Sequence, residues 1–253
     1  MYAPERQNEI VARARAAGRV DVATLAAELD VAAETVRRDL TVLERRGLLR
    51  RVHGGAVPVE RLTLEPSVDE RDLANTDAKD AIARAALALL DDASTIVIDG
   101  GTTTARLAAL LPEDRELTVI THALPVAAAV ATRPGITLHL VGGHVRGRTL
   151  VATGPWTTAA LGSLRADVVV LGANGVSVDR GLTTPDLGEA EAKRALAAAG
   201  RRVIVLADHT KIGRDELVAF ATIESVDTLV TDAGVDADLL TELGAAGVEV
   251  VTA

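Results

Sequence analysis

The sequence contains no cysteine, and its 253 residues include only one phenylalanine, one tryptophan and one tyrosine. Without cysteine the chain has neither disulfide bonds nor a thiolate nucleophile, which fits a reducing compartment. Because aromatic residues are so few, the core has to be built from alanine, valine, leucine and isoleucine. The same scarcity argues against a protein that binds single-stranded nucleic acid by stacking bases on aromatic rings.

Long apolar runs are also missing. No run approaches the roughly 18 residues that a membrane-spanning helix needs. The N-terminal sequence MYAPERQNEIV lacks the apolar core of a signal peptide. We therefore expect a cytoplasmic protein with no membrane partner.

Charge is unevenly spread along the chain. The formal net charge is −9, but residues 1–58 contain ten arginines, no lysine and eight acidic residues, a balance of +2, and residues 59–253 carry −11. Most of the chain should therefore be repelled by DNA, so that any DNA binding is confined to the first segment. Residues 59–76 contain Pro66 and few apolar residues. The sequence thus predicts two domains, 1–58 and 77–253, joined by a linker at 59–76.

The first segment has the pattern of a helix-turn-helix. Helices are expected at 4–17, 22–29 and 33–46, with Asp21 as the N-cap of the second. Only residues 30–32 separate the second and third helices. So short a turn is typical of a helix-turn-helix, in which the second of the two helices enters the major groove of DNA.

The third helix is expected to have an apolar and a polar face. Val36, Leu40 and Leu43 form an apolar stripe that packs inward. Asp39 lies beside this stripe, so we expect it to form an internal ion pair. A charge run of this kind is also typical of an ordinary solvated helix, and spacing alone does not separate the two interpretations. The outward face carries Glu34, Thr35, Arg37, Arg38, Thr41 and Arg45.

Two short apolar runs follow, LLRRV and AVP, and the segment HGG separates them. This pattern predicts a β-hairpin wing that carries Arg50, Arg51 and His53. Arginine suits a DNA-binding surface because its planar guanidinium binds guanine or phosphate through two hydrogen bonds.

Residues 25–56, including the run ETVRRDLTVLERRGLLRRVHGGA, resemble the DeoR family of bacterial transcriptional regulators. The family carries a T-[VI]-R-R-D-L…H-G-G-A signature in a winged helix-turn-helix. Ala32 stands where the family usually has serine, which removes one expected cap or phosphate contact. The resemblance implies binding to double-stranded operator DNA through Thr35, Arg37, Arg38, Thr41, Arg45, Arg50, Arg51 and His53.

From residue 77 onward, strands and helices alternate. Continuously apolar strands followed by helices indicate an α/β domain with a mostly parallel sheet covered on both faces. Strands are expected at 95–99, 117–120, 136–141, 167–172, 202–208, 228–232 and 248–251, and helices at 77–90, 103–111, 125–132, 155–162, 187–199 and 236–243.

The loop DGGTTTARL (99–107) lies between an expected strand and helix, where ligands of such sheets bind. Its glycines let backbone N–H groups approach an anion, its threonines add hydroxyls, and the helix offers its positive end. It is not a nucleotide-triphosphate loop, because no Gly-Lys-Ser/Thr follows. An ordinary tight turn with a helix cap is the competing interpretation.

Other strand ends add polar residues to the same edge. Arg146 or Lys211 is a candidate to neutralise phosphate, and His139 is expected to be a packed strand residue. Asp208, His122 and Lys211 have ordinary structural roles as alternatives, as a turn cap, a loop hydrogen bond and a solvated cation. The predicted effector site comprises Asp99, Gly100, Gly101, Thr102, Thr103, Thr104, His122, Gly142, Gly143, Asn174, Gly175, Asp208 and Lys211.

Residues 77–253 resemble the DeoR-family sensor domain, which is similar in fold to ribose-5-phosphate isomerase. The matching motifs are D-x-G-T-T at 99–103, G-G at 142–143, G-x-x-G at 172–175, E-x-x-x-K at 189–193 and D-x-[ST]-K at 208–211. The resemblance implies a phosphorylated sugar or related metabolite as effector. His122 replaces the usual asparagine. Glu189 and Lys193 also fit an ordinary surface i,i+4 pair. The Glu70-Arg71 pair matches one that is common in the family's linker.

These features predict a ligand-controlled transcriptional regulator, a repressor of sugar or carbohydrate metabolism genes that acts as a homo-oligomer, either dimer or tetramer. No cofactor, metal site or catalytic residue is expected. The alternative is a sugar-phosphate isomerase or deaminase with a DNA-binding arm, but the related isomerases carry Asp-Gly-Ala-Asp where LGAN stands here. Asn174 cannot serve as a carboxylate base. A ligand-blind DNA binder is a third possibility, against which the DGGTTT loop argues.

Overall fold

The chain divides into two units, residues 1–64 and residues 65–253. The computed structural model describes residues 3–45, 49–52, 54–58 and 65–253. We call residues 1–64 the N-terminal unit and residues 65–253 the body.

The N-terminal unit is a winged helix-turn-helix, as predicted. Asp21 caps the second helix by accepting the N–H groups of Ala23 and Thr24, at 2.8 and 3.2 Å. The wing is a three-stranded antiparallel sheet in the order β1-β3-β2, and the two-residue first strand was not expected. The elements are α1 (Ala3–Ala17), β1 (Val20–Asp21), α2 (Val22–Glu28), α3 (Ala33–Arg45), β2 (Leu49–Val52) and β3 (Gly55–Pro58).

A small aliphatic core holds the N-terminal unit together. Val36, Leu40 and Leu43 of α3 are buried, which confirms the predicted apolar stripe. They pack with Ile10 of α1 and Leu25 of α2 in one cluster. The expected last residue of the third helix, at 46, lies outside the described residues.

The body is built on a parallel sheet of seven strands, in the order β15-β14-β12-β9-β4-β5-β6. The alternation of strands and helices in the sequence is confirmed. Its central strands are the most apolar, because they are covered on both faces. The strands are β4 (Thr95–Ile98), β5 (Leu117–Thr121), β6 (Ile136–Leu140), β9 (Ala166–Gly172), β12 (Gly200–Leu206), β14 (Thr228–Thr231) and β15 (Glu249–Thr252).

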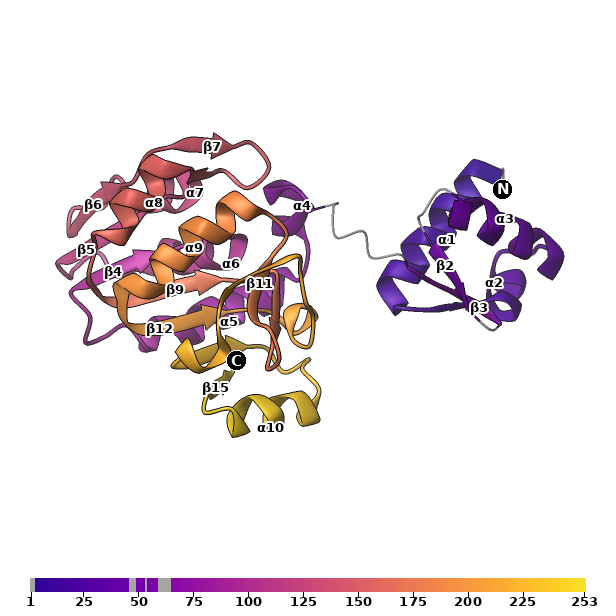
Figure 1. Ribbon diagram of the computed structural model, residues 1–253. Helices are drawn as coiled ribbons and strands as arrows, with labels where there is room; N and C mark the ends of the chain where they lie inside the picture. The colour runs from indigo at the N-terminus through magenta and orange to yellow at the C-terminus, as the bar shows by residue number, and fades with distance from the viewer. Residues whose placement is uncertain (1–2, 46–48, 53, 59–64) are drawn as a thin grey trace. The chain divides into compact units, whose positions relative to one another are not determined.

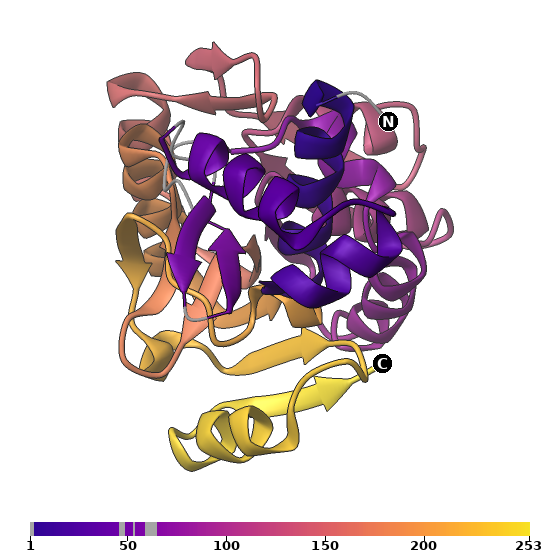
Figure 2. The same ribbon diagram turned by 90° about the vertical axis from the view of Figure 1, so that its right-hand side faces the viewer.

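Helices cover both faces of this sheet (Figure 1). Ile96 and Ile98 of β4 pack in one core with α5 (Thr76–Ala88), α6 (Thr102–Leu110) and α7 (Leu124–Val130). Val97, which points to the opposite face, packs with α8 (Pro155–Gly162), α9 (Leu187–Ala199) and α10 (Ala237–Ala245). The C-terminal α10 and β15, in yellow, lie at one edge of the body (Figure 2). None of the helices in the described ranges is long and apolar enough to cross a bilayer.

Several short elements of the body were not expected from the sequence. A hairpin joins β7 (His144–Arg146) to β8 (Val151–Thr153), and β10 (Gly175–Ser177), β11 (Gly181–Thr184) and β13 (Val218–Ala221) form a second sheet. Gly181 lies at φ +68°, and a Cβ there would stand 2.2 Å from the Ala221 carbonyl oxygen. Two single-turn 3-10 helices, η1 (His209–Lys211) and η2 (Ile223–Ser225), complete the body.

The structure differs from the expected linker at 59–76. Residues 65–76 belong to the body, and they include a helix, α4 (Val68–Leu73). Ser67 and Glu70 form a capping box, in which each side chain accepts the backbone N–H of the other residue. The sequence S-V-D-E contains this signal, but the proline and the mixed charges around it obscured it.

Candidate functional site

The polar face of α3 and the wing share one surface of the N-terminal unit. The side chains of Arg37 and Arg38 are 53 % and 80 % exposed. The Thr41 hydroxyl donates to the Arg37 carbonyl oxygen at 2.9 Å and lies 3.4 Å from Nη1 of Arg51 on β2. Thr35 is half-buried at the start of the helix. Helix and wing therefore present their cations side by side, which suits the phosphates and base edges of duplex DNA.

Asp39 is held away from this surface. Its carboxylate accepts hydrogen bonds from Arg6 Nε at 2.6 Å and Gln7 Nε2 at 2.9 Å, both from α1. The predicted internal ion pair is confirmed, and it keeps this negative charge inside the unit. The side chains of Arg45 and Arg50 and all of His53 lie outside the described residues.

The body contains a cavity of about 310 Å³ at the carboxyl ends of β4, β9 and β12. This is the edge of a parallel sheet at which ligands bind, and the volume suits a small metabolite. Ten of the predicted effector residues line it: Asp99, Gly100, Gly101, Thr102, Thr103, Thr104, His122, Asn174, Asp208 and Lys211.

Helix α6 begins at the wall of this cavity. No side chain caps its N-terminus, so the N–H groups of its first turn are open to an anion. Gly100 permits the tight path of the loop, because a Cβ there would stand 2.0 Å from Cγ1 of Val151. The loop therefore offers backbone donors at the end of a helix dipole.

All three lysines of the chain, against 24 arginines, line the same cavity. Within the described residues, the Lys211 ammonium makes no hydrogen bond or ion pair, and burial lowers its pKa. Lys79 donates only to the carbonyl oxygens of Arg71 and Ala74, and burial lowers its pKa as well. The Arg71 side chain also lines the cavity, and its buried Nε has no hydrogen-bond partner among the described residues. The charge of Asp208 acts on both lysines, but among the described residues no carboxylate forms an ion pair with Lys79, Lys211 or Arg71, and a bound anion would supply one.

The third lysine neutralises a buried carboxylate. Asp99 is 1 % exposed and accepts hydrogen bonds from Lys193 Nζ, from His122 Nε2 at 3.0 Å, and from the N–H groups of Gly100 and Gly172. Burial raises the pKa of Asp99, but the charge of Lys193 and the hydrogen bond from His122 outweigh it and hold that pKa well below its usual range. Asp99 therefore shapes the site as a permanent anion.

His122 lies between two hydrogen-bond acceptors. Its Nδ1 is 2.7 Å from the Ala152 carbonyl oxygen and its Nε2 is 3.0 Å from Oδ1 of Asp99. Both contacts are satisfied only when both ring nitrogens carry hydrogen. His122 supports the cavity wall and has no ring nitrogen left for a ligand.

The interpretation of Glu189 and Lys193 as a surface pair is wrong. Both are 4 % exposed, and they bind different partners, because Glu189 accepts from Arg146 and Thr149 whereas Lys193 binds Asp99. Arg146, a predicted phosphate partner, instead contacts three carboxylates: those of Glu65, Asp186 and Glu189. It does not line the cavity.

Three predicted effector glycines do not line the cavity: Gly142, Gly143 and Gly175. Gly143 and Gly175 serve close packing, since a Cβ would stand 2.0 Å from Oγ1 of Thr157 in one case and 2.3 Å from the Arg214 carbonyl oxygen in the other. His139, expected to be packed, is exposed on the edge strand β6.

Other lining residues were missed because they come from segments far from the glycine loop. Arg71 and Asn75 come from the segment taken for a linker, and Lys79 from the first turns of α5. Asn75 Nδ2 donates to Asp208 Oδ1 at 3.2 Å, which brings that segment to the end of β12. The Glu70-Arg71 pair of the family resemblance was the one signal that pointed there.

Comparison with known proteins gives matches to both units. A family model described as the DeoR-like helix-turn-helix domain matches residues 6–61. A second, described as the DeoR C-terminal sensor domain, matches residues 74–233.

Curated relatives match nearly the whole chain. The HTH-type transcriptional regulator GlpR of Haloferax volcanii is 35% identical over 251 residues, which cover 99% of this chain and 98% of that protein. The glycerol-3-phosphate regulon repressor of Escherichia coli K12 is 32% identical over 233 residues, 92% of each chain. Among solved structures, ribose 5-phosphate isomerase A from Methanocaldococcus jannaschii aligns over 55% of each chain with a TM-score of 0.40 and 18% identity.

Proposed function

Because the chain belongs to the DeoR family of DNA-binding transcriptional regulators, we propose that it represses genes of sugar or carbohydrate metabolism under the control of a phosphorylated sugar or related metabolite. The α3 face and the wing bind operator DNA, through Thr35, Arg37, Arg38, Thr41 and Arg51 among the described residues and Arg45, Arg50 and His53 outside them. Since the target is DNA, the proposed place of action is the cytoplasm.

The observation that carries the effector proposal is the set of cations around the open end of α6 that form no ion pair among the described residues. Lys211 and Arg71 make no side-chain hydrogen bond among the described residues, and Lys79 binds only carbonyl oxygens. A phosphate fits there, because it accepts several charge-assisted hydrogen bonds and offsets the repulsion between these cations. The name of the Escherichia coli relative refers to the regulon of a phosphorylated compound, which supports the same class of effector.

The polar groups around the cations suit the hydroxyls of a sugar. Asn174 and Asp208 line the cavity together with Thr102 and Thr103. Amide, carboxylate and hydroxyl groups of this kind give a ligand orientation as well as affinity. We propose that the phosphate lies at the α6 loop near Lys211 and that the polyol extends toward Asn174.

We propose binding without chemistry. Asn174 bonds Thr184 through its side chain, at 3.2 Å, and an amide does not act as a proton-abstracting base. Asp99, the most buried carboxylate of the cavity, is neutralised by Lys193 and His122. The purified protein should therefore not isomerise ribose 5-phosphate, and clear turnover in a coupled assay would contradict this part of the proposal.

We further propose that the regulator acts as a homo-oligomer, a dimer or a tetramer. Helix-turn-helix proteins read paired half-sites, and a symmetric oligomer presents two recognition helices at the required spacing. Light scattering of the full chain at micromolar concentration measures this directly, and a monomeric mass on operator DNA would contradict it.

The effector proposal is tested by ligand binding combined with lysine footprinting. The full chain is screened by thermal shift with ribose 5-phosphate, glucosamine 6-phosphate, glycerol 3-phosphate, their unphosphorylated forms and inorganic phosphate. Since all three lysines line the cavity, mass spectrometry after amine acetylation reports on this site and on the chain's N-terminus alone. A phosphorylated compound should raise Tm and protect Lys211.

Two variants sharpen this test. Lys211→Ala should lose the thermal shift. The control Arg165→Ala should keep it, because Arg165 is exposed and, among the described residues, bonds only the Leu164 carbonyl oxygen. Equal shifts in both variants, or equal binding of the unphosphorylated forms, would refute the proposed site.

A further inference from the structure

One wall of the cavity is made by residues 65–75, which we call the strap. In the sequence it directly follows the N-terminal unit. Pro66, Glu70, Arg71, Ala74 and Asn75 of the strap line the cavity. The part of the body that receives the connection from the DNA-binding unit is therefore also a surface that a ligand would touch.

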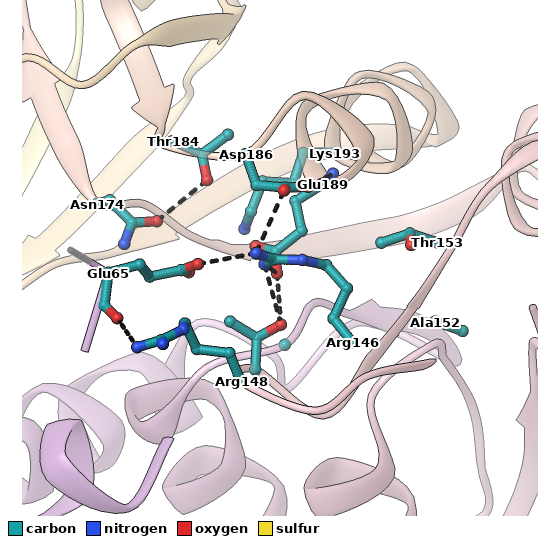
Figure 3. A network of polar contacts seen from close by, with 12 residues as sticks. Glu65, Arg146, Arg148, Ala152, Thr153, Asn174, Thr184, Asp186, Glu189 and Lys193 are labelled. Carbon is teal, nitrogen blue, oxygen red and sulfur yellow. Dashed lines mark hydrogen bonds and ion pairs between the residues drawn. The ribbon is translucent and has the colours of Figure 1, made fainter. Parts of the chain in front are cut away.

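The beginning of the strap is fastened by the β7–β8 hairpin (Figure 3). Arg146 Nη2 donates to Oε2 of Glu65 at 3.0 Å. Arg148 donates from Nη1 to the Glu65 carbonyl oxygen, and its own carbonyl oxygen accepts the N–H of Val68 at 2.8 Å. Two arginines of one short turn thus hold both ends of the first four strap residues.

The position of Glu65 depends on Arg146. Glu65 is only 8 % exposed, and its second carboxylate oxygen, Oε1, is buried without a hydrogen-bond partner among the described residues. A buried carboxylate that loses its cation carries a large desolvation cost and moves toward water. Loss of the Arg146 contact would therefore favour movement of Glu65 out of its buried position.

Arg146 also reaches the cavity, through Glu189. Its Nη1 binds Oε1 of Glu189, a buried residue that lines the cavity, and Nη2 lies 3.2 Å from Oδ2 of Asp186. Figure 3 shows the Arg146 guanidinium between the carboxylates of Glu65, Asp186 and Glu189. Three carboxylates compete for one cation, so a change at any one of them alters the strength of the ion pairs that the other two form with Arg146.

We propose that Arg146 is a positioning residue that couples the cavity to the DNA-binding unit. A metabolite whose hydroxyl groups donate to Glu189 takes part of that carboxylate's hydrogen bonding. The relative strength of the ion pairs that Arg146 forms with Glu189 and with Glu65 then differs between the empty and the occupied cavity. Because Glu65 begins the strap, a ligand in the cavity changes how firmly Arg146 holds the strap against the body. A regulatory ligand requires such a contact, one that differs between the ligand-bound and the ligand-free state.

This inference rests on the proposed effector site, and the experiment separates the two. The Glu65→Gln variant keeps the shape and one acceptor oxygen of residue 65 but removes the charge that Arg146 binds. The control is Asp72→Asn, on the same strap, which removes the ion pair with Arg106 and leaves the Arg146 cluster untouched. For wild type and both variants, titration calorimetry measures binding of the phosphorylated compound with the largest thermal shift, chosen among ribose 5-phosphate, glucosamine 6-phosphate and glycerol 3-phosphate.

The second measurement is the ratio of operator Kd with and without that compound, obtained by fluorescence anisotropy on the full chain. In Glu65→Gln, affinity for the compound should stay within about three-fold of wild type while this ratio falls at least five-fold toward one, the size of a typical coupling energy. Asp72→Asn should keep both values. A residue with a merely structural role would lower affinity and coupling together.

Arg146→Gln and the double variant complete the test. If Glu65 and Arg146 act through the same contact, the double variant should reduce the ratio of operator Kd values no further than Arg146→Gln alone. Unchanged coupling in Glu65→Gln, or equal loss in Asp72→Asn, overturns the inference and leaves the effector site intact. A wild-type chain that binds none of the phosphorylated compounds overturns the proposed function, and this inference with it.

Discussion

Each unit of this protein contains a buried acidic residue whose charge is bound internally. In the N-terminal unit, Asp39 is buried against Arg6 and Gln7, so the exposed cations of α3 are not weakened by it. In the body, Asp99 is buried against Lys193 and His122, so the cavity above it is not negative. In both places a buried acid is neutralised internally, and the cations nearby stay available for a polyanion or a phosphate.

Arg38 provides a direct test of the DNA-binding surface. Its side chain is 80 % exposed on the outward face of α3, so replacement by alanine should leave folding unchanged. Arg38→Ala should weaken operator binding by about 1 to 3 kcal/mol if the guanidinium reads a base. Anisotropy with operator and with random duplex measures this. An operator affinity equal to wild type would remove Arg38 from the interface.

Asp99 makes the stability of the body depend on pH in the acid range. Its pKa in the folded state lies below the unfolded value of about 3.9. The stabilisation is thus complete above about pH 4 and is lost as pH falls through the folded-state pKa. Asp99→Asn should lower the free energy of unfolding at pH 7 by about 3 to 5 kcal/mol, because it leaves the buried Lys193 ammonium without its carboxylate.

Urea unfolding between pH 3 and pH 7 checks this expectation. Between pH 4 and pH 3 the wild-type stability should decline more steeply than that of Asp99→Asn, so that the two curves begin to approach each other. Parallel curves over this range would show that Asp99 does not carry the acid sensitivity.

Among the elements, α4 is a short helix that is stabilised mainly by contacts within its own segment. Its capping box joins Ser67 and Glu70, and the helix has no buried residue of its own. Ser67→Ala should speed amide hydrogen exchange in residues 68–73 roughly five-fold, the effect of losing one helix cap. The global unfolding transition should stay where it is. Exchange mass spectrometry resolves this segment, and unchanged exchange there would mean that packing alone holds α4.

The main elements were predictable from sequence because their signals are local. Apolar runs such as TIVI and VVVL mark strands that are buried on both faces, and the spacing of Val36, Leu40 and Leu43 marks one face of a helix. The short strands β10, β11 and β13 carry no such signal. Strands β10 and β11 pair as a tight hairpin, with Ser177 opposite Gly181, and β13 joins them through pairing over a long sequence distance, for example Leu182 with Ala221.

The candidate site was predictable only in part for the same reason. The DGGTTT loop is recognisable from a few consecutive residues. The burial of Glu189 and Lys193, in contrast, depends on partners 43 and 94 residues away in the sequence. Spacing at i and i+4 cannot distinguish such a pair from a surface ion pair. The contributions of Arg71 and Lys79 follow from the strap folding onto the body, which its polar composition did not indicate.

At the scale of the whole molecule, the division of charge has a consequence for DNA binding. The segment 1–58 carries +2 and the remainder −11, so only a small face of the chain attracts DNA. If at least three arginines contact phosphates, the logarithm of the association constant should fall with the logarithm of salt concentration with a slope of about −2.7 or steeper. Titrations of the full chain from 50 to 200 mM KCl give this slope. A slope near zero would contradict an electrostatic contact with the backbone.

The central claim is that an anion in the body's cavity changes how tightly the chain holds DNA. The most direct test is operator Kd with and without the bound phosphorylated compound, for wild type and for Lys211→Ala. The account predicts a change of at least five-fold in wild type and none in Lys211→Ala. An equal change in both proteins, or none in a wild type that binds the compound, would contradict it.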